Sequence, residues 1–123
     1  MKLHADANPT LNTVTAYGEG WLEINRQRYA GAVLVQPEGD VRGWPVGDFD
    51  TLAAAHFEAL LALRPEVVLL GTGERQRFPH PRLYAVLSQA RIGLEAMDTR
   101  AACRTYNILM SEGRRVVAAL LPL

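Results

Sequence analysis

A Gly-Thr-Gly turn at residues 71–73 is the stretch of this sequence whose residue types and spacing come closest to a chemical site. It follows the apolar run Val67–Leu70, and glycines after a buried strand let a pyrophosphate approach the bare backbone of a dinucleotide-binding fold. The rest of that fingerprint is missing, because Gln76 stands where the third glycine belongs and a charged segment delays the next helix until Pro79. The alternative is a strand-to-loop turn that needs a positive φ at a glycine. The candidate ligand-binding residues of the turn are Gly71, Thr72 and Gly73.

Four arginines accompany this turn on two segments of the chain. Arg75 and Arg77 lie in the loop after it, whereas Arg100 and Arg104 lie near the start of a predicted helix. Both segments follow predicted parallel strands, whose carboxyl ends meet at one edge of a sheet, so convergence of the arginines would create an anion-binding mouth. Asn107 shares the helical stripe of Arg100 and Arg104, and it joins the candidates because asparagine is a poor helix former. The alternative is that this stripe is the solvated side of an amphipathic helix.

The single cysteine and the three histidines form no catalytic or metal-binding pattern. Cys103 lies near a predicted helix start, where the dipole would stabilise a thiolate, but no histidine neighbours it in the sequence. Its alanine and tyrosine neighbours favour a packing role. His4, His56 and His80 show no metal-ligand spacing, and His80, between two prolines, is expected to be a cap or loop residue. With no carboxylate pair, nucleophile elbow or P-loop in the sequence, we predict no catalytic residue, metal or cofactor.

The apolar pattern predicts a three-layer α/β domain with a mixed central sheet, in which an antiparallel meander is followed by a β-α-β-α-β unit. A polar arm is expected over residues 1–12, and the meander comprises predicted strands at residues 13–17, 21–24, 28–36 and 41–44. The second half comprises predicted helices at residues 51–63, from 79 onward and at 99–112, and predicted strands at 67–70, 93–97 and 116–121. These last three strands are predicted to be parallel because helices separate them. The pattern leaves open whether the meander joins the central sheet or forms a second layer.

Length and composition predict one globular domain over residues 1–123, with 49% apolar and 21% charged residues. The 13 basic residues balance 13 acidic ones without a block of like charge, so we predict no binding to nucleic acid. No apolar run approaches the roughly 20 residues of a transmembrane helix. The first residues show neither a signal-peptide nor a transit-peptide pattern. Together with a lone cysteine, which suits a reducing compartment, these features predict a cytoplasmic protein.

Several motifs occur in order along residues 30–123: the Gly-Thr-Gly turn, Phe78-Pro79, Met97-Asp98-Thr99, Ala102-Cys103, Tyr106-Asn107 and Glu112-Gly113-Arg114. In this order the sequence resembles the MTH-type domain family, which includes the mitochondrial NADH dehydrogenase (complex I) assembly factor three and the adipogenesis-associated MTH-type domain protein. The resemblance implies an α/β domain of its own topology. For the mitochondrial branch it also implies help in assembling the respiratory NADH dehydrogenase through protein partners at a membrane. It implies no known reaction and no catalytic residue.

Two functions from different classes follow from these observations. The first is a non-enzymatic protein-interaction or respiratory-complex assembly-type factor, with respiratory-complex subunits among its possible partners. The second is a small-molecule or anion-binding domain, including a nucleotide-binding enzyme, that uses the Gly-Thr-Gly loop and the neighbouring arginines.

Overall fold

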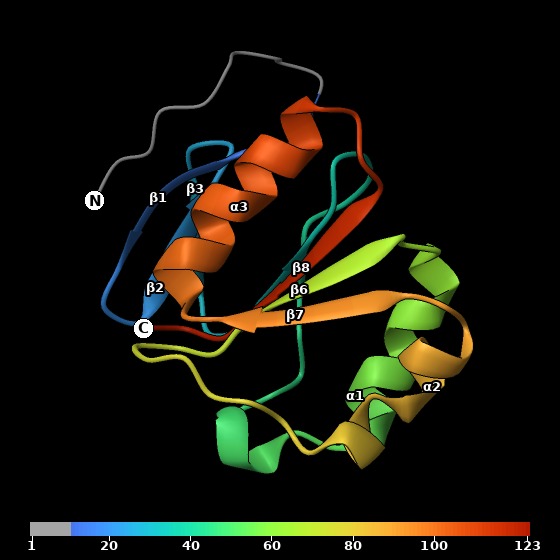
Figure 1. Cartoon of the computed structure of the whole chain (residues 1–123). Helices are drawn as coiled ribbons and strands as arrows, with labels where there is room; N and C mark the ends of the chain where they lie inside the picture. The colour runs from blue at the N-terminus through green and yellow to red at the C-terminus, as the bar shows by residue number, and fades with distance from the viewer. Residues whose placement is uncertain (1–10) are drawn as a thin grey trace.

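The structure is a computed structural model that describes residues 11–123 (Figure 1). Most of the predicted polar arm lies outside the described residues. The elements in chain order are β1 (Val14–Gly18), β2 (Trp21–Ile24), β3 (Gln27–Ala30), β4 (Val33–Val35), β5 (Arg42–Gly43), the 3₁₀ helix η1 (Phe49–Thr51), α1 (Ala54–Glu58), η2 (Ala59–Leu63), β6 (Val67–Gly71), η3 (Pro81–Leu83), α2 (Ala85–Gln89), β7 (Gly93–Met97), α3 (Thr99–Ser111) and β8 (Val116–Leu120). This order confirms a meander of strands followed by alternating helices and strands.

A five-stranded mixed sheet, in the order β5-β4-β8-β6-β7, forms the centre of the fold. β6 pairs in parallel with both β7 and β8, whereas β4 pairs antiparallel with β5 and β8. Parallel neighbours need a crossover, which η3 and α2 supply between β6 and β7 and α3 supplies between β7 and β8. All of β8 and most of β6 are buried. Burial on both faces explains why these two strands are near-continuous apolar runs in the sequence.

The first three strands form a separate antiparallel sheet, in the order β1-β2-β3. The prediction of one strand over residues 28–36 was wrong, because Gly31 takes a φ of +81° and the chain divides there into β3 and β4. β3 pairs with β2, whereas β4 crosses to the central sheet and pairs with β8. A tight turn joins β2 and β3: Asn25 and Arg26 both have positive φ, as a two-residue hairpin turn requires.

The single helix predicted over residues 51–63 is instead three short helical segments. The Asp48 carboxylate caps η1 by accepting a hydrogen bond from the Thr51 amide at 3.1 Å. Leu52 then leaves the helical region, with ψ of 135°, and buries its side chain. The chain turns helical again as α1 and η2, which end at Arg64 in a left-handed conformation. The break between η1 and α1 thus coincides with the buried side chain of Leu52.

Two apolar cores lie on opposite faces of the central sheet, which gives the predicted three layers. On one face α3 and the three-stranded sheet cover the central sheet, and on the other lie α1, η2 and α2 (Figure 1). Alternate residues of β8 serve the two cores: Val116 and Ala118 face α3, whereas Val117 and Ala119 face α1. None of the helices described in residues 11–123 is long and apolar enough to cross a membrane.

Candidate functional site

The Gly-Thr-Gly turn and the start of α3 meet at one rim of the central sheet. The turn follows β6 and α3 follows β7, and these two strands run in the same direction side by side. The Gly73 carbonyl oxygen accepts a hydrogen bond from the Thr99 amide at 2.9 Å, and the Gly73 amide donates to Thr99 Oγ1 at 2.8 Å. The structure therefore brings together the two segments that carry most of the predicted site residues.

The backbone of the turn is already engaged within the protein. The Thr72 amide donates to the Met97 carbonyl at 2.9 Å, and the Gly71 carbonyl accepts from the Leu121 amide at 2.9 Å. A Cβ on Gly71 would lie only 2.9 Å from Thr99 Oγ1, so this glycine allows β6 and α3 to pack closely. Gly73 takes a φ of +95°, the conformation expected of a strand-to-loop turn. With both amides of residues 72 and 73 used, this turn lacks the free N–H groups that cradle a phosphate in dinucleotide-binding folds.

Two of the four candidate arginines are paired with carboxylates. Both terminal nitrogens of the Arg100 guanidinium contact the Glu74 carboxylate, at 3.1 and 3.4 Å, and this hydrogen bonding raises the pKa of Arg100. Arg77 contacts Asp50 at 2.8 Å, and its guanidinium carbon lies 4.1 Å from the centre of the Phe49 ring. The acidic partners therefore offset half of the positive charge that the sequence predicted for this mouth.

Arg75 and Arg104 are the candidate arginines whose charge is not offset in this way. Both side chains are exposed, and no ion pair is described for either of them within residues 11–123. Arg75 lies in the loop between Glu74 and Arg77, whereas Arg104 lies one helical turn along α3 from Arg100. These two residues carry what remains of the predicted anion-binding charge.

Asn107 holds the second sheet against α3. Its side-chain oxygen accepts a hydrogen bond from the Val14 amide at 3.0 Å, and its side-chain nitrogen donates to the Val14 carbonyl at 2.9 Å. The residue is 5% exposed, so it does not belong to a solvated stripe with Arg104, as the alternative interpretation expected. Its amide replaces a neighbouring strand at the free edge of β1. Asn107 therefore has a structural role, because it bonds to Val14, which lies 93 residues away in the sequence.

Thr99 is the residue of this rim that sequence reasoning missed. It is fully buried, and Oγ1 accepts from the Gly73 amide while donating to the Leu121 carbonyl at 2.7 Å. One hydroxyl therefore joins the loop after β6, the first residue of α3 and the chain after β8. The sequence signal was an Asp-Thr pair at a helix start, and Asp98 does cap α3 by accepting from the Ala101 amide at 3.0 Å.

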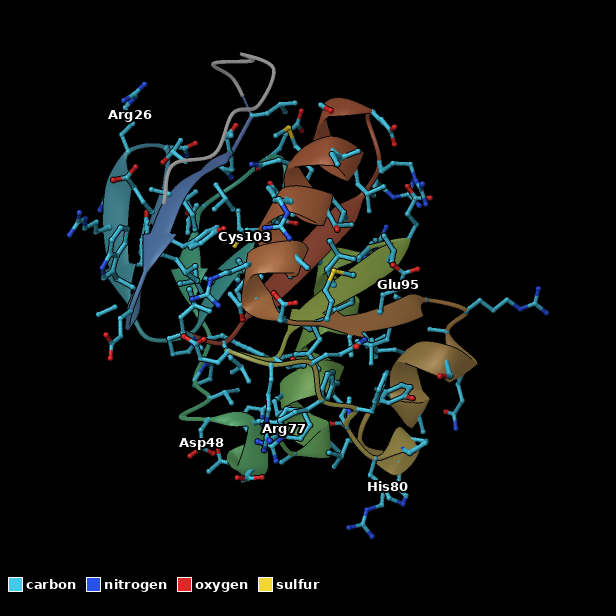
Figure 2. The ribbon with its side chains drawn as sticks, turned by 60° about the vertical axis from the view of Figure 1, so that its left-hand side comes forward. Arg26, Asp48, Arg77, His80, Glu95 and Cys103 are labelled. Carbon is cyan, nitrogen blue, oxygen red and sulfur yellow. The ribbon has the colours of Figure 1, made fainter. Side chains whose placement is uncertain are left out.

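Cys103 and His80 have the roles that the sequence predicted. Cys103 is fully buried in the core beneath α3, and burial raises the pKa of its thiol to about 12, so the thiol is neutral near pH 7. His80 caps η3: its Nδ1 accepts a hydrogen bond from the Arg82 amide at 3.1 Å. Figure 2 shows Cys103 on the inner side of α3 and His80 at the lower edge of the molecule.

Exposed apolar side chains and a cavity are further features of the surface. Phe78, in the loop that follows the Gly-Thr-Gly turn, is 76% exposed, and Ile108 on α3 is 57% exposed. A cavity of about 620 Å³ lies at the opposite end of the sheet, where its lining includes Leu63, Met110 and Val116. None of the predicted site residues lines this cavity.

A sequence model of one protein family matches residues 14–121, nearly the whole described chain. Its description is "Protein of unknown function (DUF498/DUF598)". The chain belongs to this family. A relative from Bos taurus, "NADH dehydrogenase [ubiquinone] 1 alpha subcomplex assembly factor 3", is 32% identical over 117 residues, which cover 94% of this chain and 63% of the relative. The chain thus spans less than two thirds of that relative's length.

Solved structures place the DUF498 chain among Mth938-like domains. A crystal structure of a protein from Bordetella parapertussis is 49% identical with a TM-score of 0.88, covering 95% of this chain and all of that chain. A solution NMR structure from Bordetella pertussis, described as a Mth938-like domain, is 43% identical with a TM-score of 0.84, covering 99% of this chain and 92% of that chain. The resemblance noted from the sequence motifs is therefore confirmed.

Proposed function

We propose that this chain is a non-enzymatic protein-interaction factor that works in the cytoplasm and assists assembly of the respiratory NADH dehydrogenase. The support from relatives is the assembly factor 3 name carried by the Bos taurus homologue, which aligns with 94% of this chain. The partners in this proposal are subunits of the respiratory complex.

The proposal rests on the observation that the backbone amides of the turn and two of the four candidate arginines already have partners within the protein. The amides of Thr72 and Gly73 are bonded within the fold, and Arg77 and Arg100 are paired with carboxylates. A binding site for a small molecule is usually a concave pocket with convergent, available polar groups. This rim instead presents an exposed aromatic side chain, Phe78, beside backbone amides and two arginines that already have partners within the protein. Such a surface suits contact with another protein.

Deletion of the gene in native cells that make a respiratory NADH dehydrogenase tests this proposal. We expect the assembled complex to fall at least about twofold on native gels, with NADH oxidation by membranes falling in parallel and returning on complementation. A tagged copy of the chain is expected to co-purify at least one subunit of the complex. Unchanged assembly, together with purifications that contain no subunit, would contradict the proposal.

A second candidate is an anion-binding domain, which is supported by the exposed charges of Arg75 and Arg104. A thermal-shift screen with nucleotides, phosphates and acidic metabolites tests it. A ligand at about 100 times its dissociation constant adds roughly 2.7 kcal/mol, enough to raise the melting temperature by several degrees. The shift should disappear in the double variant Arg75→Ala, Arg104→Ala. A screen in which no compound changes the melting temperature removes this candidate.

A further inference from the structure

Phe78 combines high exposure with a firmly held backbone. Its side chain is 76% exposed, whereas the next residue, Pro79, is buried. The Thr72 hydroxyl donates to the Arg75 carbonyl at 2.7 Å and accepts from the Arg77 amide at 3.2 Å, which fixes the loop from inside. The aromatic ring therefore projects from a braced segment of chain.

Side chains on either side of the loop add to this bracing. Gln76 donates its side-chain amide to the Ala96 carbonyl at 2.9 Å, which ties the loop to the free edge of β7. Arg77 ties it to the segment before α1 through Asp50. A loop held at both sides loses little conformational entropy on binding, and exposed aromatic residues in such positions often dominate the energy of protein interfaces. Figure 2 shows Arg77 and His80, which bracket Phe78 in the sequence, on the lower side of the molecule.

In the part of the chain that the structure describes, the acidic residue near Phe78 in the sequence, Glu74, has an ion-pair partner, whereas two of the arginines do not. Glu74 and Asp50 are each engaged by an arginine, and Asp48 caps η1. Arg75 and Arg82 lie three residues before and four after Phe78, both are exposed, and neither forms an ion pair described in residues 11–123. The unpaired charge on the chain segment that carries Phe78, residues 74–82, is therefore positive. A complementary surface would present an apolar socket for the ring and carboxylates at the rim of that socket.

We propose that Phe78 anchors a protein-binding surface, flanked by Arg75 and Arg82, and that the partner is a protein with an apolar socket bordered by aspartate or glutamate. This inference rests on the proposed function, because it specifies how the partner of an assembly-type factor is held. It assigns the contact to the loop after β6 and leaves the cavity at the opposite end of the sheet uninvolved.

Photo-crosslinking in native cells identifies what this surface contacts. A benzoylphenylalanine residue is placed at position 78 in one variant and at position 108 in a matched control, since Ile108 is also apolar and exposed. We expect one protein adduct from position 78 only, with the crosslinked peptide in an apolar pocket that has acidic neighbours. The charge-reversed background Arg75→Glu, Arg82→Glu should lose the adduct. Adducts with lipid or nucleic acid, no adduct, or a socket without carboxylates would each overturn the inference.

Titration of the purified partner then measures the contribution of the ring. Phe78→Ser is expected to weaken binding by about 30-fold, the effect of a typical interface hot spot. Ile108→Ser should change the dissociation constant by less than about twofold, and Phe78→Trp should retain most of the affinity. Because Phe78 is exposed, its replacement by serine should leave the melting temperature within about 2 °C of the original. A change in affinity below about threefold for Phe78→Ser would overturn the inference.

Failure of the Phe78 surface and failure of the proposed assembly role would give different experimental results. If deletion impairs the NADH dehydrogenase and Phe78→Ser restores it fully, the Phe78 surface is wrong while the assembly role stands. If deletion leaves the complex unchanged but position 78 still crosslinks to an acid-rimmed socket, the surface stands and the assembly role is wrong.

Discussion

Replacement of Asn107 by leucine should lower the free energy of unfolding by about 2–4 kcal/mol, because it leaves two buried backbone groups without partners. Those groups are the amide and the carbonyl of Val14, both of which bond to the Asn107 side chain at the edge of β1. Leucine has a similar volume, so little of the loss should come from packing. Urea unfolding followed by circular dichroism measures the change.

Hydrogen exchange would show where the Asn107→Leu variant weakens. The Val14 amide and the β1–β2 pairs should lose protection first, while β6 and β8 in the central sheet retain theirs. Ser111→Ala is the matched control on α3, since Ser111 is exposed and should change stability by less than about 0.5 kcal/mol. A loss of similar size in both variants would show that the contact with Val14 does not hold the second sheet.

Replacement of Thr99 by valine should also lower the free energy of unfolding by about 2–4 kcal/mol. Valine keeps the shape of threonine but removes the oxygen that accepts from the Gly73 amide and donates to the Leu121 carbonyl. Both groups would then be buried without a partner beside a fully buried side chain. The measurement is again the free energy of unfolding from urea denaturation.

Thr99→Ser is the control for this prediction, because serine keeps the hydroxyl and loses only a methyl group. It should retain most of the stability, with a loss of about 1 kcal/mol. The difference between the valine and serine variants then reports the two hydrogen bonds. Equal losses in the two variants would mean that packing of the methyl group, and not the hydroxyl, holds the rim together.

Local sequence pattern was most informative in the second half of the chain. The strands β6, β7 and β8 lie where the sequence predicted them, and the apolar runs of β6 and β8 reflect burial on both faces of the sheet. Prediction failed where one residue changed the direction of the chain. Gly31 divides a continuous apolar stretch between two sheets, and the predicted helix is interrupted at Leu52, whose backbone is extended and whose side chain is buried. Neither event has a local signal strong enough to separate it from ordinary strand or helix sequence.

The candidate site shows the same division between local and tertiary information. The sequence placed the Gly-Thr-Gly turn and the arginines near one rim, since strand direction alone brings those loops together. It did not reveal the pairing of Arg77 with Asp50 or of Arg100 with Glu74, because these partners are 27 and 26 residues apart. Opposite charges at such separations have no periodic signal in the sequence.

By itself, then, the sequence determined the order of strands and helices from β6 onward and the parallel direction of the last three strands, since these follow from burial and backbone conformation over a few residues. Only the tertiary structure decided that Asn107 closes the edge of β1, that Thr99 joins three segments and that Phe78 remains exposed on a braced loop. Hydrogen bonds between distant residues depend on where the packed sheets and helix place each polar group, and local chain chemistry does not fix that placement.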